Sequence, residues 1–118
     1  MHIRAYGRAE PFITADGSTI RELLGLPTAP VRHQSLAEAT LVGGQATERH
    51  YHAQSEEIYY VVEGSGEMEL DGERQQVGVG DAVLIPPGAR HQIRADAEGL
   101  RFLCCCAPAY RDEDTFFD

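Results

Sequence analysis

The chain has 118 residues, a formal net charge of −9, 42% hydrophobic and 25% charged residues, a balance typical of one globular domain. All ten basic residues are arginine, which excludes a Schiff base on lysine, and so acidic a chain without a basic cluster is a poor match for nucleic acid. No apolar run has the length of a membrane span, and MHIRAYGRAEPF lacks the apolar core of a signal peptide, so we expect no membrane contact and a cytoplasmic location.

The first half of the chain predicts short extended segments separated by turns. Asp16-Gly17 is a tight-turn signal, and residues 18–25 fit either a strand or one short helical turn. Residues 33–42 and 45–52 alternate polar and apolar side chains, as strands do. This half therefore predicts a series of short strands.

The second half reads almost entirely as strands and turns. Its Gly- and Pro-containing turns recur every 8–12 residues or so, which favours an antiparallel sandwich or barrel. The acidic tail RDEDTFFD is either a strand docked on a partner subunit or a loose end. The strands expected here are 56–64, 67–70, 73–77, 82–85, 91–95 and 100–110.

Three consecutive cysteines occupy the last expected strand. Cys104, Cys105 and Cys106 match neither disulfide geometry between neighbours nor a CxxC redox motif, so we interpret them as packing residues. The alternative is that the thiols are reactive. Alternation places Cys104 and Cys106 on one face of the strand and Cys105 on the other, and one of these faces could line the barrel interior.

Three histidines and a carboxylate form the strongest candidate for a site. His50 and His52 are two residues apart, so both side chains point to the same face of a strand. Glu57 lies in the next expected strand, and His91 follows the turn at Pro86-Pro87-Gly88. Imidazole and carboxylate ligands together suit Mn, Fe, Ni, Zn or Cu better than Ca or Mg. The sequence predicts one divalent transition metal on His50, His52, Glu57 and His91.

These residues resemble the two motifs of the cupin family. Gly44, His50, His52, Glu57 and Gly64 follow the spacing of the first motif, G(X)5HXH(X)3,4E(X)6G. The second motif, G(X)5PXG(X)2H, is matched by Gly80, Pro86, Gly88 and His91. The resemblance implies an all-β, cupin-type antiparallel jelly-roll β-barrel and a homodimer. It implies a single domain over 1–118, with N-terminal strands in 1–32, a barrel core over about 33–107 and an acidic tail in 108–118.

Two positions need a comment against this family pattern. The second motif usually continues to an asparagine where this chain has Ala95, a place that is not a metal ligand. Glu56 is an alternative carboxylate, but counting back from Gly64 selects Glu57, and alternation turns Glu56 away from Tyr59 and Val61. His2 and His33 match neither motif, and we interpret them as surface or structural histidines.

Tyr59 and Glu48 are the candidate catalytic residues. Tyr59 shares the face of Glu57 and either contacts substrate near the metal or is a core tyrosine with a bonded hydroxyl. Glu48 shares the face of His50 and His52 and is either a general base or a solvated carboxylate near a strand start. Arg90 either meets an anion at the barrel mouth or is solvated.

The site fits a metalloenzyme acting on a small polar or anionic metabolite, with dioxygenase, isomerase, decarboxylase or lyase chemistry. The alternative is a non-catalytic cupin that binds or senses a small molecule. An enzyme predicts a cavity with a polar acid or base group within reach of the metal, whereas a binding module predicts an apolar cavity. The inward-facing candidates are acidic, aromatic or apolar, which disfavours a sugar phosphate.

Overall fold

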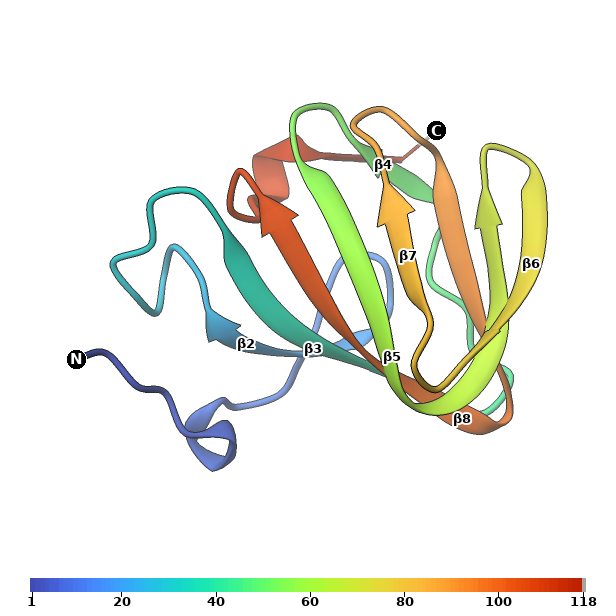
Figure 1. The fold of residues 1–118 in the computed structure, drawn as a ribbon, viewed down its shortest axis with the longest axis horizontal. Helices are drawn as coiled ribbons and strands as arrows, with labels where there is room; N and C mark the ends of the chain where they lie inside the picture. The colour runs from blue at the N-terminus through green and yellow to red at the C-terminus, as the bar shows by residue number, and fades with distance from the viewer. Residues whose placement is uncertain (118) are drawn as a thin grey trace.

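The structure, a computed structural model, describes residues 1–117, and its regular secondary structure is almost entirely strand. Two three-residue 3-10 helices are the only helices in this range, and neither could cross a membrane. The elements in chain order (Figure 1) are η1 (Tyr6–Arg8), β1 (Phe12–Ile13), β2 (Thr19–Leu24), β3 (Ser35–Leu41), β4 (His50–His52), β5 (Glu56–Leu70), β6 (Glu73–Gly78), β7 (Ala82–Ile85), β8 (His91–Ala107), η2 (Asp112–Asp114) and β9 (Thr115–Phe117).

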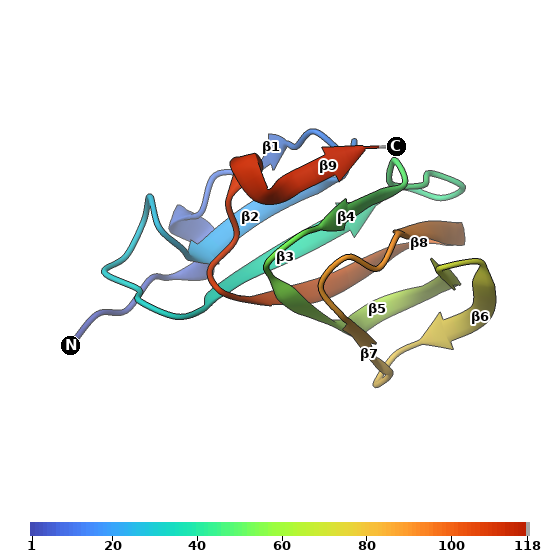
Figure 2. The same ribbon diagram turned by 90° about the horizontal axis from the view of Figure 1, so that it is seen from above.

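All strand pairs in the described chain are antiparallel, and together they form one sheet that curls on itself. β8 lies at its centre and pairs with β3, β4 and β5, while β5 also pairs with β6 and β7. Figure 2, seen from above, shows β4 and β9 on one side of β8, and β5, β6 and β7 on the other. The alternating pattern thus produces the antiparallel architecture that it predicts.

Two long strands replace two pairs of strands that the sequence predicts as separate. The expected turns at residues 64–66 and 96–99 lie inside β5 and β8, which pair along most of their length. Gly64 has φ +79°, and a Cβ there would come within 2.1 Å of the Gly99 carbonyl oxygen. The glycines therefore allow the bent strands β5 and β8 to approach each other closely. The sequence had predicted that the chain reverses direction at these glycines.

The structure shows that residues 18–25 contain a strand and not a helical turn. The strand expected over residues 45–52 is shorter than predicted. β2 runs antiparallel to β3, so the helical alternative is wrong. Only His50–His52 are strand in the second segment, with a single bridge from Ala46 to Arg94 before them. The short β4 nevertheless places His50 directly opposite His91 of β8.

The core lies on the inner face of β5 and β8. Glu57, Tyr59 and Val61 point inward from β5, whereas Ile58 and Tyr60 point outward and are exposed. Phe102 on β8 is 1% exposed, and burying a side chain of this size contributes about 1.5–3 kcal/mol. The main cluster is Ala39, Leu41, Tyr59, Val61, Met68, Val77, Ile85, Ala89, Ile93, Ala95, Leu100 and Phe102.

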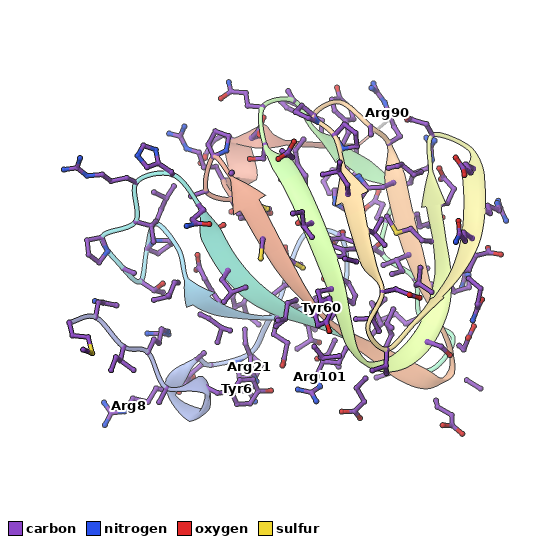
Figure 3. All side chains as sticks on the ribbon, viewed as in Figure 1. Tyr6, Arg8, Arg21, Tyr60, Arg90 and Arg101 are labelled. Atoms are coloured by element: carbon purple, nitrogen blue, oxygen red, sulfur yellow. The ribbon has the colours of Figure 1, made fainter. Side chains whose placement is uncertain are left out.

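The N-terminal segment is anchored by side chains on the outer face of the sheet (Figure 3). The Tyr6 hydroxyl donates to Glu38 Oε1 at 2.8 Å, and the Arg21 guanidinium lies 4.7 Å over the Tyr6 ring. Arg101 donates to the other oxygen of Glu38 at 3.0 Å. Arg21 also donates to the Ala9 carbonyl at 2.6 Å, which holds the chain just before β1.

The acidic tail docks on its own chain. β9 pairs with β4, with Thr115 opposite His52 and Phe117 opposite His50. Phe116 stacks on Tyr51 with ring centroids 5.3 Å apart. The loose-end alternative for this tail is therefore wrong, and the expected strand forms, paired with β4 of its own chain. Neither alternative considered that the tail pairs with β4, whose outer edge would otherwise have unpaired backbone groups.

Candidate metal centre

Three strands bring the four predicted ligands together. His50 and His52 project from β4 to one side, His91 begins β8 directly opposite His50, and Glu57 lies near the start of β5. The three imidazoles offer ligand nitrogens that all lie within 4.8 Å of one another. All four side chains are buried, between 0% and 5% exposed.

Each imidazole is held by its Nδ1 atom, which faces a backbone carbonyl. The acceptors are Glu48 O for His50 (2.7 Å), Asp114 O for His52 (3.2 Å) and Ala89 O for His91 (2.9 Å). A carbonyl only accepts, so each Nδ1 carries the proton and each Nε2 is left with a lone pair. Hydrogen bonds of this kind, from Nδ1 to a carbonyl, orient the histidine ligands of metal sites.

Glu57 lies against two of these imidazoles. Its Oε1 atom is 3.3 Å from His52 Nε2 and 3.6 Å from His91 Nε2, and its Oε2 atom accepts from the Cys106 thiol at 3.3 Å. Burial works to raise the pKa of Glu57, but His52 and His91 outweigh it and lower the pKa to about 2. The carboxylate is therefore ionised and available as a ligand.

The surroundings shift the pKa values of His50 and His52 in opposite directions. Burial lowers the pKa of His50, and the neighbouring His91 lowers it further. Burial also acts to lower the pKa of His52, but Glu57 reverses this and the net shift is upward. Glu57 thus favours the protonated form of His52, whereas burial and His91 favour the neutral form of His50.

Two buried polar atoms within residues 1–117 have no hydrogen-bond partner, and both belong to this cluster. They are Glu57 Oε1 and His91 Nε2. Leaving such groups unpaired is costly, about 1–3 kcal/mol each for neutral groups. A divalent cation between the three Nε2 atoms and Glu57 would satisfy both, so this donor set fits a transition metal of the predicted kind.

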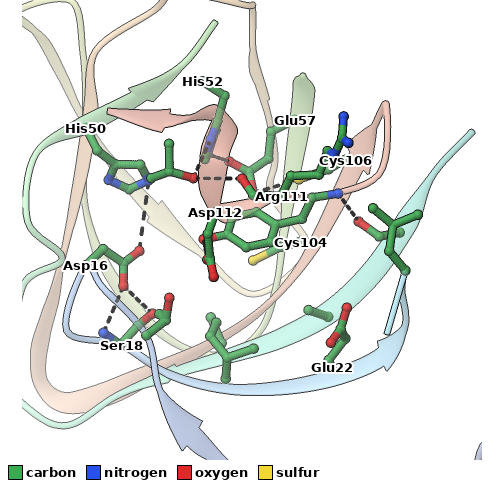
Figure 4. Close-up of a pocket in the computed structure, with 18 of the residues that line it drawn as sticks. Asp16, Ser18, Glu22, His50, His52, Glu57, Cys104, Cys106, Arg111 and Asp112 are labelled. Atoms are coloured by element: carbon green, nitrogen blue, oxygen red, sulfur yellow. Dashed lines mark hydrogen bonds and ion pairs between the residues drawn. The ribbon is translucent and has the colours of Figure 1, made fainter. Parts of the chain in front are cut away.

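The cluster opens into a cavity of about 360 Å³, a size that suits a small metabolite. Figure 4 shows His50, His52 and Glu57 at its inner end. One part of the wall is apolar and comes from β1, β2, β3 and β8, with Phe12, Ile20, Ala37, Ala39 and Phe102. The other part is polar and comes from the β1–β2 turn and the tail, with Asp16, Ser18, Arg111, Asp112 and Thr115.

Tyr59 lines the cavity as its position on the face of Glu57 predicts. Its ring lies 6.0 Å from that of His91 and 4.5 Å from that of Phe102. Its hydroxyl makes no hydrogen bond to any described residue, unlike the bonded core tyrosine that was the alternative. Burial and the Glu57 charge raise its pKa well above the ordinary value, so the hydroxyl stays protonated and can donate to a ligand.

The structure does not bring the Glu48 or Arg90 side chains to the cavity. Glu48 is exposed, and only its backbone takes part, through the carbonyl that accepts from His50. Arg90 lies 3.7 Å over the Tyr51 ring and donates to Gly88 O at 2.9 Å. The role predicted for the Glu48 carboxylate has no support in this geometry, because the side chain points to solvent at the strand start.

Sequence reasoning missed Asp16, which it used only as a turn signal. Asp16 Oδ1 accepts from the backbone N–H and the hydroxyl of Ser18, at 2.9 and 2.6 Å. The other oxygen, Oδ2, lies 3.9 Å from His50 Nε2 (Figure 4). The Asp-Gly turn signal was correct, but nothing local to it shows that the turn folds over the histidines.

The cysteines divide between the two faces as alternation predicts. Cys104 and Cys106 line the cavity, whereas Cys105 is exposed on the outer face. All three are free thiols. Burial and the Glu57 charge raise the pKa values of Cys104 and Cys106, which keeps both thiols protonated and poorly nucleophilic, in keeping with the packing interpretation.

Comparisons with known proteins agree with this architecture. A family model described as a cupin domain matches residues 37–106, which include all four candidate ligands. An uncharacterised protein of Methanocaldococcus jannaschii is 47% identical over 111 residues, covering 93% of this chain and 89% of that protein. A dimethylsulfoniopropionate lyase of Ruegeria pomeroyi is 35% identical over 82 residues; these span 70% of this chain but about half (53%) of the lyase.

Solved structures share the fold. KdgF from a Halomonas species superposes with a TM-score of 0.81 at 21% identity, over 96% of this chain and 97% of that one. Oxalate decarboxylase from Bacillus subtilis gives a TM-score of 0.84 at 23% identity, over 98% of this chain but 32% of that one. At these identities the likeness is one of fold, and it confirms the all-β jelly-roll that the sequence predicts.

Proposed function

The chain belongs to the cupin family, and from that premise we propose that it is a metal-dependent enzyme acting on a small polar metabolite. The observation that carries the proposal is the pair of buried, unpartnered ligand atoms, Glu57 Oε1 and His91 Nε2, inside a cluster whose Nδ1 atoms are all tied to carbonyls. Mn, Fe, Ni and Zn are the metals that such a nitrogen and oxygen set favours.

In this proposal some residues hold the metal and others contact the substrate. His50, His52, His91 and Glu57 would hold the ion, which when bound supplies a Lewis acid that polarises a substrate oxygen. The Tyr59 hydroxyl is a fixed proton donor in the cavity wall, and Asp16 Oδ2 is a fixed acceptor beside His50. The apolar wall around Phe102, which lies against the Tyr59 ring, excludes water from that part of the cavity.

The same two groups favour an enzyme over a non-catalytic binding module. A binding module predicts an apolar cavity, whereas this cavity has a protonated phenol and a carboxylate near the ligand cluster. A phenol and a carboxylate in the wall of such a cavity are groups that can hold or move a proton on a bound molecule.

The similar proteins support lyase and decarboxylase reactions as the first to test. The Ruegeria relative is a lyase, and a solved structure with the same fold is a decarboxylase. Both names describe reactions in which a small group leaves the substrate, and a Lewis acid assists such chemistry by stabilising the charge left behind.

The test is turnover of a mixture of small polar carboxylic acids by protein loaded with Mn, Fe, Ni or Zn, followed by mass spectrometry. The proposal predicts a metal-dependent product that disappears in Glu57→Gln and Tyr59→Phe and persists in His33→Gln, which alters an exposed histidine outside the site. A compound that binds and is recovered unchanged under all metals would instead establish the binding module.

A further inference from the structure

The charges that line the cavity are mostly negative. The lining includes one arginine, Arg111, against five carboxylates: Asp16, Glu22, Glu57, Asp112 and Glu113. Even with a divalent ion bound, these side chains leave an excess of two negative charges. A ligand with two negative charges, such as a dicarboxylate or a phosphate ester, meets net repulsion in this cavity.

The carboxylates have defined positions. Asp16 lies at the inner end, with Oδ2 3.9 Å from His50 Nε2 and its other oxygen fixed by Ser18. Glu22 and Asp112 approach the cavity from β2 and from η2. Burial raises the pKa of Glu22, Arg4 lowers it, and the negative charge of Asp112 adds to the rise, so these two carboxylates influence each other.

The inner end of the cavity therefore attracts a negative charge at one point and a positive charge at another, so the two ends of a short ligand are expected to differ in charge. The three imidazoles with one carboxylate leave a bound divalent ion with a net positive charge, which attracts an anionic oxygen. Asp16 stands next to the same cluster and accepts hydrogen bonds there, which favours a cation or a strong donor. Since Asp16 is so close to His50, the two ends of the ligand are separated by only a few bonds.

We propose that the cavity selects a small zwitterion, whose carboxylate meets the metal and whose cationic group meets Asp16. This proposal rests on the proposed function, because the carboxylate needs a metal to bind. It adds a substrate class that the ligand cluster alone does not specify. The geometry that supports it is the cavity of about 360 Å³, which Asp16 lines together with the ligand cluster and which has room for a short ligand.

The test uses three matched probes that share a carboxylate on a three-carbon chain: β-alanine, hydracrylate and malonate. Their far ends are cationic, neutral and anionic. Binding to cobalt-loaded protein is followed by the visible spectrum of the cobalt ion, together with the metal content of each sample. We expect β-alanine to bind more tightly than malonate by about tenfold or more, the scale of a unit charge at short range in a partly buried site.

Asp16→Asn tests the assigned contact, because asparagine keeps the shape and an acceptor for Ser18 but removes the charge. We expect it to abolish the preference for β-alanine over malonate while metal content and hydracrylate affinity stay unchanged. Glu56→Gln is the matched control: it removes one carboxylate next to Glu57 in sequence but on the exposed face of β5, and should leave the preference intact. Asp112→Asn should weaken the preference partially.

The outcomes separate the two levels of the claim. Metal-loaded wild-type protein that binds malonate as tightly as β-alanine overturns the zwitterion proposal and leaves the proposed function standing. A preference that survives in Asp16→Asn, or a loss of metal in that variant, overturns the role given to Asp16. Protein that takes up no metal overturns the proposed function and this inference with it.

Discussion

Glu57 is the residue on which the site's charge depends. In the metal-free protein its folded pKa of about 2 lies below the ordinary value of 4.5, because the effect of His52 and His91 exceeds that of burial. A carboxylate with a depressed pKa contributes stability above its unfolded pKa and loses it as pH falls toward the folded value. The contribution corresponds to about 3 kcal/mol, as an order of magnitude for a buried, tightly coupled group.

We therefore predict that metal-free wild-type protein loses stability between about pH 4.5 and pH 2 more steeply than Glu57→Gln. Urea unfolding at several pH values on chelator-treated protein measures this. Glu56→Gln, on the exposed side of the same strand, should follow the wild-type curve. Parallel curves for wild type and Glu57→Gln would contradict the assignment of the charge to Glu57.

Cys106 orients the same carboxylate from behind. Its thiol donates to Glu57 Oε2 at 3.3 Å, which leaves Oε1 facing the imidazoles. Removal of a group that orients a metal ligand typically lowers metal affinity about 10–100-fold. We predict a loss in this range for Cys106→Ala, less for Cys106→Ser, and none for Cys105→Ala, whose thiol is exposed on the other face. Competition with a chromophoric chelator measures the affinity, and equal affinities for the two alanine variants would contradict it.

At the scale of elements, the C-terminal tail, through η2 and β9, completes the site from within the same chain. Asp114 accepts from the backbone N–H of Ser55 at 2.9 Å and of Gln54 at 3.0 Å, and its own carbonyl faces His52 Nδ1. The tail thus fixes both the turn after β4 and the orientation of one ligand.

We predict that Asp114→Ala lowers the free energy of unfolding by about 1–3 kcal/mol, because it leaves backbone donors without their acceptor. It should also weaken metal binding, since the turn after His52 loosens. Glu113→Ala is the control, because this exposed neighbour makes no hydrogen bond through its side chain within the described chain. Urea unfolding and metal titration measure the two effects, and a normal metal affinity in Asp114→Ala would show that η2 does not orient His52.

The candidate ligands were predictable from sequence because strand alternation is local and because both motifs occur in order. Alternation puts His50 and His52 on one face, and the spacing within each motif places Glu57 and His91 at strand starts. The continuous strands β5 and β8 were not predictable, because Gly64 and Gly99 signal a turn as readily as a bend. Asp16 and the tail were missed for a different reason. Their approach to the histidines depends on packing between segments far apart in the chain, for which no local pattern exists.

At the scale of the whole molecule, the candidate ligand cluster lies inside the family match, whereas part of the cavity wall lies outside it. The family match ends at residue 106 and begins at 37, so Asp16, Glu22 and the tail residues that line the cavity lie outside it. We expect the cluster within the match to hold the metal and the segments outside it to influence which ligand enters the cavity. Selectivity should therefore change with those segments while metal binding persists.

A homodimer stays a prediction at this scale. Ile58, Tyr60 and Leu84 are exposed apolar side chains on the outer face of β5 and β7, where Ile58 pairs with both Leu84 and Cys105. A second copy packed on this face would remove them from water. We expect light scattering to give twice the chain's 13.0 kDa, and a monomer in Tyr60→Arg/Leu84→Arg. A wild-type monomer at high concentration would contradict the dimer.

The most direct test of the central claim is the metal content of untagged protein purified without chelator, measured by mass spectrometry. The account predicts about one equivalent of Mn, Fe, Ni or Zn per chain. This metal should be lost in His50→Gln and His91→Gln and kept in His33→Gln, whose histidine is exposed and outside the cluster. A site that is empty and does not fill when these metals are added would contradict the account.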